Sequence, residues 1–228
     1  GQRARAPGRG DGLPRPRNKG RKGGIFLIAI LDYGVGNLRS VEKAFELLGY
    51  IARVTDSPRV ALQAERIVLP GVGAFGDAMA RLRDTGLAEA VLEAHRRGKP
   101  LLGICLGMQL LFEASEENGF HRGLGLLPGV VTRFDQKGLK VPHMGWNTLH
   151  TRPGALFDPG ARPCVYFVHS YLMRDIFPAW TAATADYGGA FTAAVERGPL
   201  LGTQFHPEKS GEEGLAMLRR FAGWTPGE

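Results

Sequence analysis

Apolar, β-branched runs alternate with segments of helical period through the first half of this chain. Runs at 25–31, 66–69 and 99–104 are bounded by turn residues and predict buried strands. A helix is expected after the first run, with Asn37 as its N-cap and Gly49 closing it. Helical period continues over residues 76–97 after the second run. Since parallel strands are joined by crossovers of this kind, the alternation predicts βαβ units.

The second half of the chain changes to shorter strand-like runs joined by turns. They predict strands at 129–134, 163–168, 191–196 and 200–205, with a final helix over 211–222. A length of 228 residues suits one well-buried domain rather than two. The predicted fold class is therefore α/β, a single domain with a mixed, mostly parallel central sheet flanked by helices.

The net charge of +7 is concentrated at the N-terminus. Residues 1–24 contain eight basic side chains and one acidic one, whereas residues 25–228 contain 21 of each. The expected domain, 25–228, is thus neutral by formal count and predicts no nucleic-acid partner. The segment before it is rich in Gly, Pro and Arg, so we expect it to be disordered, and either non-native or a solvated basic arm. No apolar stretch approaches a membrane span, and no membrane partner is expected.

Residues 103–107 read Gly-Ile-Cys-Leu-Gly, the form of a nucleophile elbow between a strand and a helix. The tight turn needs flanking glycines because it leaves no room for side chains. It projects the sulfur of Cys105 above the sheet edge, where the helix N-terminus favours the thiolate. The backbone N–H of Leu106 is one expected donor to an oxyanion, and Val72 or Gly73 in a nearby glycine-rich loop is the expected second.

The strand predicted at 200–205 runs directly into His206-Pro207-Glu208. A residue before proline is pushed into extended geometry, and in an extended segment residues i and i+2 point the same way. His206 and Glu208 should therefore face one side together. The carboxylate can then fix the imidazole tautomer while the other ring nitrogen takes the proton of a thiol. An elbow cysteine, an oxyanion loop and this pair form one mechanism.

The other cysteine and the isolated histidines have a plainer interpretation. Cys164 begins a strand-like run and is expected to be a small buried hydrophobic residue. Neither cysteine has a partner at a metal-ligand spacing, so neither a metal site nor a disulfide framework is predicted. His95, His121 and His150 are given no role, because a lone histidine is more often a polar structural residue.

On these residues the chain resembles the class I glutamine amidotransferases, whose glutaminase core carries a Gly-Ile-Cys-Leu-Gly-Met-Gln elbow and a His-Pro-Glu. Here these are residues 103–109 and 206–208, and the resemblance covers residues 25–222. Within the family the chain is most similar to the glutaminase subunits of imidazole glycerol phosphate synthases, which serve histidine biosynthesis. The runs that carry this finer resemblance are 32–37, 70–75, 142–147, 167–171 and 206–210.

The resemblance implies a Cys105–His206–Glu208 triad that releases ammonia from glutamine without a cofactor. The substrate's amino and carboxylate groups would be held by a set of pocket residues, namely the backbone of Gly73 with Gln109, Glu117, Ser170 and Tyr171.

The resemblance also implies a heterodimer with a cyclase subunit of (β/α)₈ fold, in the cytoplasm. Asn37, Trp146, Tyr166 and Lys209 would lie at the docking face and the ammonia gate. Without the family, Trp146 and Tyr166 are interpreted as buried aromatics and Lys209 as a solvated charge. Because ammonia must not reach water, we expect activation by the partner's ligand, with the loop around Val72 as the switching element.

Three alternatives stay open at this stage. The first is a class I glutaminase that serves a different acceptor synthase, in a nucleotide or chorismate pathway. The second is a dinucleotide-binding module, because residues 71–76 satisfy G-x-G-x-x-G, although the following strand ends in Cys105 and not in an acidic residue. The third is a non-catalytic docking subunit, against which the intact triad argues.

Overall fold

The computed structural model describes residues 26–134, 138–173 and 176–227, so the expectation for residues 1–24 lies outside the described residues. The elements follow one another in this order: β1 (Leu27–Leu31), α1 (Leu38–Leu47), β2 (Ile51–Thr55), α2 (Pro58–Gln63), β3 (Arg66–Gly71), α3 (Phe75–Asp84), α4 (Leu87–Arg96), β4 (Leu101–Cys105), α5 (Leu106–Leu110), β5 (Phe112–Ser115), β6 (His121–Arg122), β7 (Leu127–Arg133), β8 (His143–Thr148), β9 (His150–Thr151), β10 (Cys164–His169), β11 (Tyr171–Leu172), η1 (Pro178–Trp180), β12 (Thr181–Asp186), β13 (Ala190–Arg197), β14 (Leu200–Thr203), η2 (Pro207–Lys209) and α6 (Gly211–Gly223).

The central sheet has eight strands in the order β2-β1-β3-β4-β14-β13-β12-β9. Neighbours from β2 to β14 pair in parallel, and β13, β12 and β9 continue the sheet in antiparallel pairs. Two smaller sheets join β10 to β8 and order β11-β7-β5-β6. The predicted fold class, with its mixed and mostly parallel central sheet, is confirmed.

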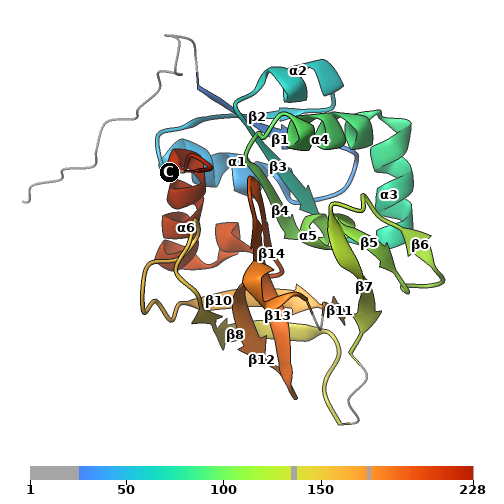
Figure 1. Cartoon of the computed structure of the whole chain (residues 1–228), viewed down its shortest axis with the longest axis vertical. Helices are drawn as coiled ribbons and strands as arrows, with labels where there is room; N and C mark the ends of the chain where they lie inside the picture. The colour runs from blue at the N-terminus through green and yellow to red at the C-terminus, as the bar shows by residue number, and fades with distance from the viewer. Residues whose placement is uncertain (1–25, 135–137, 174–175, 228) are drawn as a thin grey trace, which may run out of the picture.

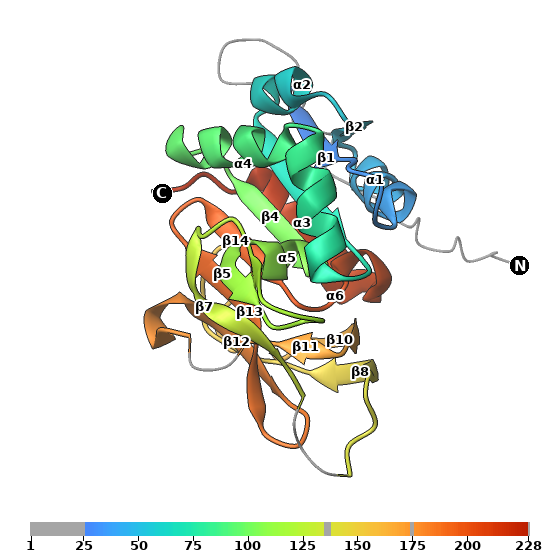
Figure 2. The ribbon, with the colours of Figure 1, turned by 90° about the vertical axis from the view of Figure 1, so that its right-hand side faces the viewer.

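The strands are covered by helices on two faces. Residues of the inner parallel strands enter two separate apolar clusters: Ile104 packs in the cluster that contains α1 and α6, and Leu101 in the one that contains α2, α3, α4 and α5. Figures 1 and 2 show the helices around the parallel strands, with β8, β12 and β13 at the other end of the molecule. Burial on both faces explains why the parallel strands read as unbroken apolar runs.

Several local expectations need adjustment in the helical half. Gly49 follows α1 with φ 81°, as its expected closing role requires, but the Asn37 side chain makes no capping hydrogen bond. The helical period at 76–97 is two helices, separated by a left-handed Gly86 (φ 71°).

The antiparallel half corrects two interpretations. Cys164 is exposed, so the prediction of a buried cysteine is wrong. It starts β10, whose alternation buries Val165 and Phe167 and turns Cys164 to the other face. The interpretation of Trp146 as a buried aromatic is also wrong, because it lies on the outer face of β8 with 58% of its surface exposed.

Candidate active site

The expected triad residues come together at one edge of the central sheet. Strands β3, β4 and β14 are adjacent and parallel, so their carboxyl ends meet. The loop of residues 72–74 follows β3, Cys105 ends β4, and His206 lies shortly after β14. Ligands of open α/β sheets bind beyond the carboxyl ends of the strands. The topology thus delivers a glycine-rich loop, a thiol and an imidazole to one place.

Cys105 sits on a sharp strand-to-helix turn. Its backbone has φ 54° and ψ −112°, and α5 begins at the next residue. A positive φ on a residue with a side chain is strained, as in other nucleophile elbows. The flanking glycines are required, because a Cβ on Gly107 would overlap the carbonyl oxygen of Leu69 and one on Gly103 would lie 2.8 Å from the Gly107 carbonyl oxygen.

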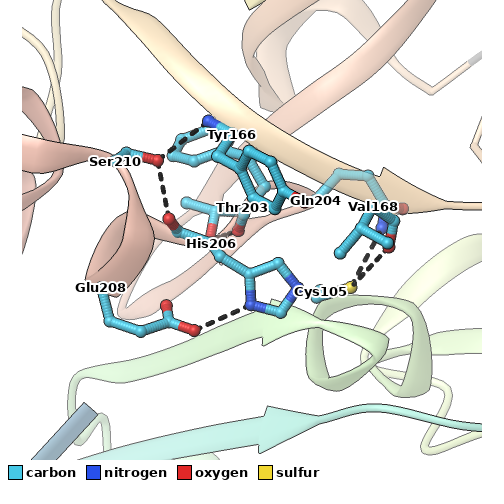
Figure 3. A network of polar contacts seen from close by, with 9 residues as sticks. Cys105, Tyr166, Val168, Thr203, Gln204, His206, Glu208 and Ser210 are labelled. Carbon is cyan, nitrogen blue, oxygen red and sulfur yellow. Dashed lines mark hydrogen bonds and ion pairs between the residues drawn. The ribbon is translucent and has the colours of Figure 1, made fainter. Parts of the chain in front are cut away.

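His206 and Glu208 form a buried pair beside the thiol. Nδ1 of His206 lies 2.8 Å from Oε1 of Glu208, and the two side chains are 2% and 1% exposed. Figure 3 shows the imidazole between the carboxylate and Cys105. The expected contact is present, but the extended geometry predicted for the triplet is wrong. Only His206 is extended, whereas Pro207–Lys209 form the 3₁₀ turn η2, which brings Glu208 back to the ring.

The second ring nitrogen of His206 is left for the thiol. Nε2 is buried and has no hydrogen-bond partner among the described residues. Burial lowers the pKa of His206, but contacts with Cys105 and Glu208 raise it by more, to about 9. The imidazole is therefore held in its charged form at neutral pH, and a cation beside a sulfur favours the thiolate.

A cavity of about 300 Å³ opens over the sulfur. The predicted oxyanion residues and the substrate-binding residues that the resemblance implies line it together with Cys105; they are Val72, Gly73, Leu106, Gln109, Glu117, Ser170 and Tyr171. The cavity is also lined by Pro142, Val168 and His169, to which no role is assigned from the sequence. Segments that lie far apart in the chain therefore form one pocket around the expected nucleophile.

Two side chains connect the expected oxyanion loop to its surroundings. Tyr33 is buried and donates a hydrogen bond of 2.6 Å to the carbonyl of Pro70, just before the loop. Burial, and then the charge of Cys105, raise the pKa of Tyr33, so its hydroxyl keeps its proton. Glu117 accepts the N–H of Phe75 at 2.8 Å, just after the loop. Between these anchors the positive φ falls on Gly73, at 99°, where it costs little.

The expected docking residues lie on or next to elements that contact one another around η2, the turn that carries Glu208. Trp146 and Tyr166 are paired across β8 and β10, with ring centroids 6.0 Å apart. Lys209 is exposed in η2, and α1, which begins after Asn37, contacts η2. Met144, on the same strand as Trp146, is 61% exposed. Large exposed apolar side chains gathered in one place mark interaction surfaces.

Other features of the described residues point to no second chemistry. A more open hollow of about 510 Å³ lies at the outer sheet edge, between β9, β12 and β13, and contains none of the expected site residues. The described ranges contain no group of three His, Cys, Asp or Glu side chains placed to bind a metal ion. Nor do they contain a helix with the length and apolar character that a bilayer crossing needs.

The family model for class-I glutamine amidotransferases matches residues 29–223. The chain belongs to this family. This amidotransferase is 53% identical over 205 residues to the imidazole glycerol phosphate synthase subunit HisH of Syntrophotalea carbinolica, a match that covers 86% of the chain and 98% of the relative. It is 47% identical over 199 residues to the chloroplastic imidazole glycerol phosphate synthase hisHF of Arabidopsis thaliana, covering 86% of the chain but 34% of that longer protein.

A solved structure agrees with the fold. The crystal structure of a glutamine amidotransferase superposes on this amidotransferase with a TM-score of 0.69, at 20% identity, covering 86% of the chain and 99% of the other. At this identity the likeness supports the fold alone.

Sequence reasoning missed two further contacts of the Cys105 sulfur. Sγ of Cys105 lies 3.8 Å from both the carbonyl oxygen of Val168 and the Nε2 of Gln204. A signal was present for Gln204, because it lies two residues before His206 at the end of a strand and so points to the same side. No comparable signal exists for a backbone carbonyl such as that of Val168.

Proposed function

We propose that this amidotransferase is the glutaminase subunit of an imidazole glycerol phosphate synthase and that it releases ammonia from glutamine with Cys105, His206 and Glu208. The observation that carries the catalytic part is the convergence of the elbow thiol and the buried His206–Glu208 pair beside one cavity. The relatives that share about half of the residues over most of the chain support the pathway.

The reaction follows from the protonation states of the pair. The Cys105 thiolate attacks the amide carbon of the glutamine side chain, and the carbonyl electrons move to the oxygen. The N–H groups of Leu106 and of Val72 or Gly73 stabilise that oxyanion. The imidazolium of His206 then protonates the departing ammonia as the C–N bond breaks. Neutral His206 next takes a proton from water, which hydrolyses the thioester to glutamate and frees the thiolate.

Different residues of the cavity bind the ammonium and carboxylate groups of the substrate. Glu117 uses Oε2 to accept the Phe75 N–H, which leaves Oε1 for the substrate's ammonium group. The Gly73 backbone, Ser170 and Tyr171 hold the carboxylate, and Gln109 forms the wall near the elbow. Because Glu117 joins the pocket to the segment just after the oxyanion loop, substrate binding and loop position are coupled.

A cyclase subunit with a (β/α)₈ barrel, in the cytoplasm, is the partner we propose for the surface that holds Trp146, Tyr166, Lys209 and Asn37. This surface borders the triad, so ammonia can pass from Cys105 to the partner without meeting water. The Arabidopsis relative, a longer protein under the same enzyme's name, supports a close association. A glutaminase for another acceptor synthase remains the rival, and no feature of the site favours it.

The first experiment measures glutamate release from glutamine by the purified chain alone, with the cyclase subunit, and with the cyclase subunit plus its nucleotide ligand. We expect weak activity alone and strong stimulation by the liganded complex. Cys105→Ala should lower the stimulated rate by at least about 10³-fold, because it removes the nucleophile. The matched control is Cys164→Ser, which changes the exposed cysteine and should keep the rate.

Two further results would separate the parts of the proposal. Activity that the cyclase does not change would keep the glutaminase and remove the pathway. Trp146→Ala should weaken binding of the cyclase in a titration, whereas Phe177→Ala, which changes a 60% exposed aromatic just before η1, should not. Equal effects of the two substitutions would remove Trp146 from the docking surface.

A further inference from the structure

Gln204 lies between the nucleophile and the wall of the substrate cavity. It is fully buried, with 0% of its surface exposed. Its Nε2 donates toward Sγ of Cys105 at 3.8 Å, and its Oε1 accepts a hydrogen bond of 2.9 Å from Nε2 of Gln109. Figure 3 shows the Gln204 amide and the His206 ring both pointing toward the sulfur. None of the roles described so far uses this side chain.

A backbone carbonyl fixes which end of the Gln204 amide meets the sulfur. Nε2 of Gln109 donates to the carbonyl oxygen of Tyr171 at 3.1 Å, and that oxygen can only accept. Gln109 must therefore present its NH₂ group toward both Tyr171 and Gln204. Gln204 must accept this hydrogen bond with its carbonyl oxygen, which turns its own NH₂ group to Cys105. Reversing either amide would oppose two donors or two acceptors in a buried position.

The same carbonyl is anchored from a second direction. Nδ1 of His169 lies 2.8 Å from the Tyr171 oxygen and must donate to it. Burial lowers the pKa of His169 to about 3, so the ring is neutral at neutral pH. The chain of donors from Tyr171 through Gln109 to Gln204 therefore starts at a well-fixed acceptor. This polarity persists whatever the state of Cys105.

The contacts of the sulfur change when the thiol loses its proton. As a thiol, Cys105 can donate to the carbonyl oxygen of Val168. As a thiolate it has nothing to donate, and that oxygen then faces a negative charge. The titratable groups that act on Cys105 are His206, which carries the opposing positive charge, and Tyr33, which stays neutral. The amide N–H of Gln204 is the neutral donor on the sulfur in either state.

We propose that Gln204 is a further functional residue of this site, which donates a hydrogen bond to the Cys105 thiolate and holds Gln109 so that its carbonyl faces the substrate. The proposal deepens the proposed function and rests on Cys105 as the nucleophile. Nε2 of Gln109 donates one hydrogen to Tyr171 and the other to Gln204, so Oε1 of Gln109 is left to accept from the substrate in the cavity. One buried amide thus links thiolate formation to the shape of the pocket.

The test measures the thiolate directly and needs no turnover. In a Cys164→Ser background, the rate of Cys105 alkylation by iodoacetamide is followed from pH 5.5 to 10. Gln204→Met keeps the volume but has no donor, so we expect alkylation at pH 7 to slow by about tenfold and the pH profile to move to higher pH. Circular dichroism and the thermal midpoint show whether the variant is folded.

Gln204→Glu is the second variant and separates the two roles. It keeps an oxygen for Gln109 but places an oxygen next to the sulfur, so alkylation should slow at least as much while KM for glutamine stays near that of the background protein. Gln204→Met should also raise KM severalfold, since Gln109 loses its acceptor. A KM effect without an alkylation effect would contradict the thiolate role.

The outcomes distinguish this proposal from the glutaminase assignment. A folded Gln204→Met or Gln204→Glu variant whose alkylation profile superimposes on that of the background protein would overturn the proposal. If the variants slow alkylation while the background protein hydrolyses no glutamine, the contact between Gln204 and Cys105 stands and the proposed function fails.

Discussion

Two groups of buried histidines in this molecule have opposite charge preferences. His206 follows the parallel strand β14 and lies between Cys105 and Glu208, which together raise its pKa to about 9 despite burial. His143 and His169 face each other across the antiparallel β8–β10 pair, and burial lowers their pKa values to about 4 and about 3. Burial alone drives a histidine to its neutral form, and only anionic neighbours hold the charge.

The neutral pair is built from aromatic rings and one backbone carbonyl. Since Nδ1 of His169 donates to Tyr171, its Nε2 must accept, and Nδ1 of His143 donates to it at 3.1 Å. The His143 ring stacks on Phe167 and on Tyr187, with centroids 4.8 and 4.1 Å away. Nothing in this arrangement offers or takes a proton during a reaction. The comparison therefore assigns chemistry to His206 and support to the pair.

The largest expected effect tests that division. His206→Asn should lower stimulated glutamine hydrolysis by at least about 10³-fold, because both the general acid and the charge beside the thiolate are lost. His169→Asn is the matched change in the other group and should cost about tenfold at most, chiefly in KM, since it loosens the segment after β10 that carries Ser170 and Tyr171. Steady-state kinetics of the complex measure both. Comparable losses in kcat would erase the distinction between the two groups.

The division also shows what the sequence could and could not predict. The parallel core could be predicted because strands buried on both faces read as continuous apolar runs, and the elbow and the His-Pro-Glu run mark the ends of two of them. The burial of side chains in the antiparallel half could not be predicted as well. Cys164 was assigned to the interior because its strand-like run is apolar, and Trp146 because it is a large aromatic residue, yet the alternation of β10 and β8 turns both outward.

Local geometry at the site was the second gap. The contact between His206 and Glu208 was expected from an extended triplet, but a 3₁₀ turn produces it. Proline restricts the residue before it and also suits the first position of a turn, so the motif predicts proximity better than conformation. Gln204 could have been noticed from its position two residues before His206, but its contacts with Cys105 and Gln109 join residues far apart in the chain, as does the His143–His169 contact, and no spacing rule encodes such pairs.

The next effect in size concerns pH, and the two groups should act with opposite sign. The pKa of His206 is raised from about 6.5 when unfolded, so its contribution to the free energy of unfolding is complete below pH 6.5 and is lost as the pH rises through about 9. The pKa values of His143 and His169 are lowered, so their contribution is complete above pH 6.5 and is lost as the pH falls toward 4.

Urea denaturation at pH 5, 7 and 9 measures these slopes. The free energy of unfolding of the wild-type protein should fall by on the order of 1–3 kcal/mol from pH 7 to pH 9, because each unit of pKa shift corresponds to about 1.4 kcal/mol. In His206→Asn this decrease should be absent. His169→Asn should instead remove part of the loss between pH 7 and 5. The control is Cys105→Ala, which deletes one cause of the raised pKa and should shrink the high-pH loss only. A high-pH loss that His206→Asn leaves intact would place its origin elsewhere.

The smallest effect separates stacking from hydrogen bonding within the neutral pair. His143→Phe keeps a flat ring between Phe167 and Tyr187 but leaves Nε2 of His169 without its donor. We expect a loss of about 1–2 kcal/mol in the free energy of unfolding, the cost of one unsatisfied buried acceptor, and a change of less than about twofold in glutaminase kcat. The matched variant His143→Ala removes the stacking as well and should cost more. If His143→Phe were as stable as the wild type but lost activity, the hydrogen bond would serve catalysis through the Tyr171 carbonyl. The His143–His169 pair would then have a catalytic role as well as a structural one.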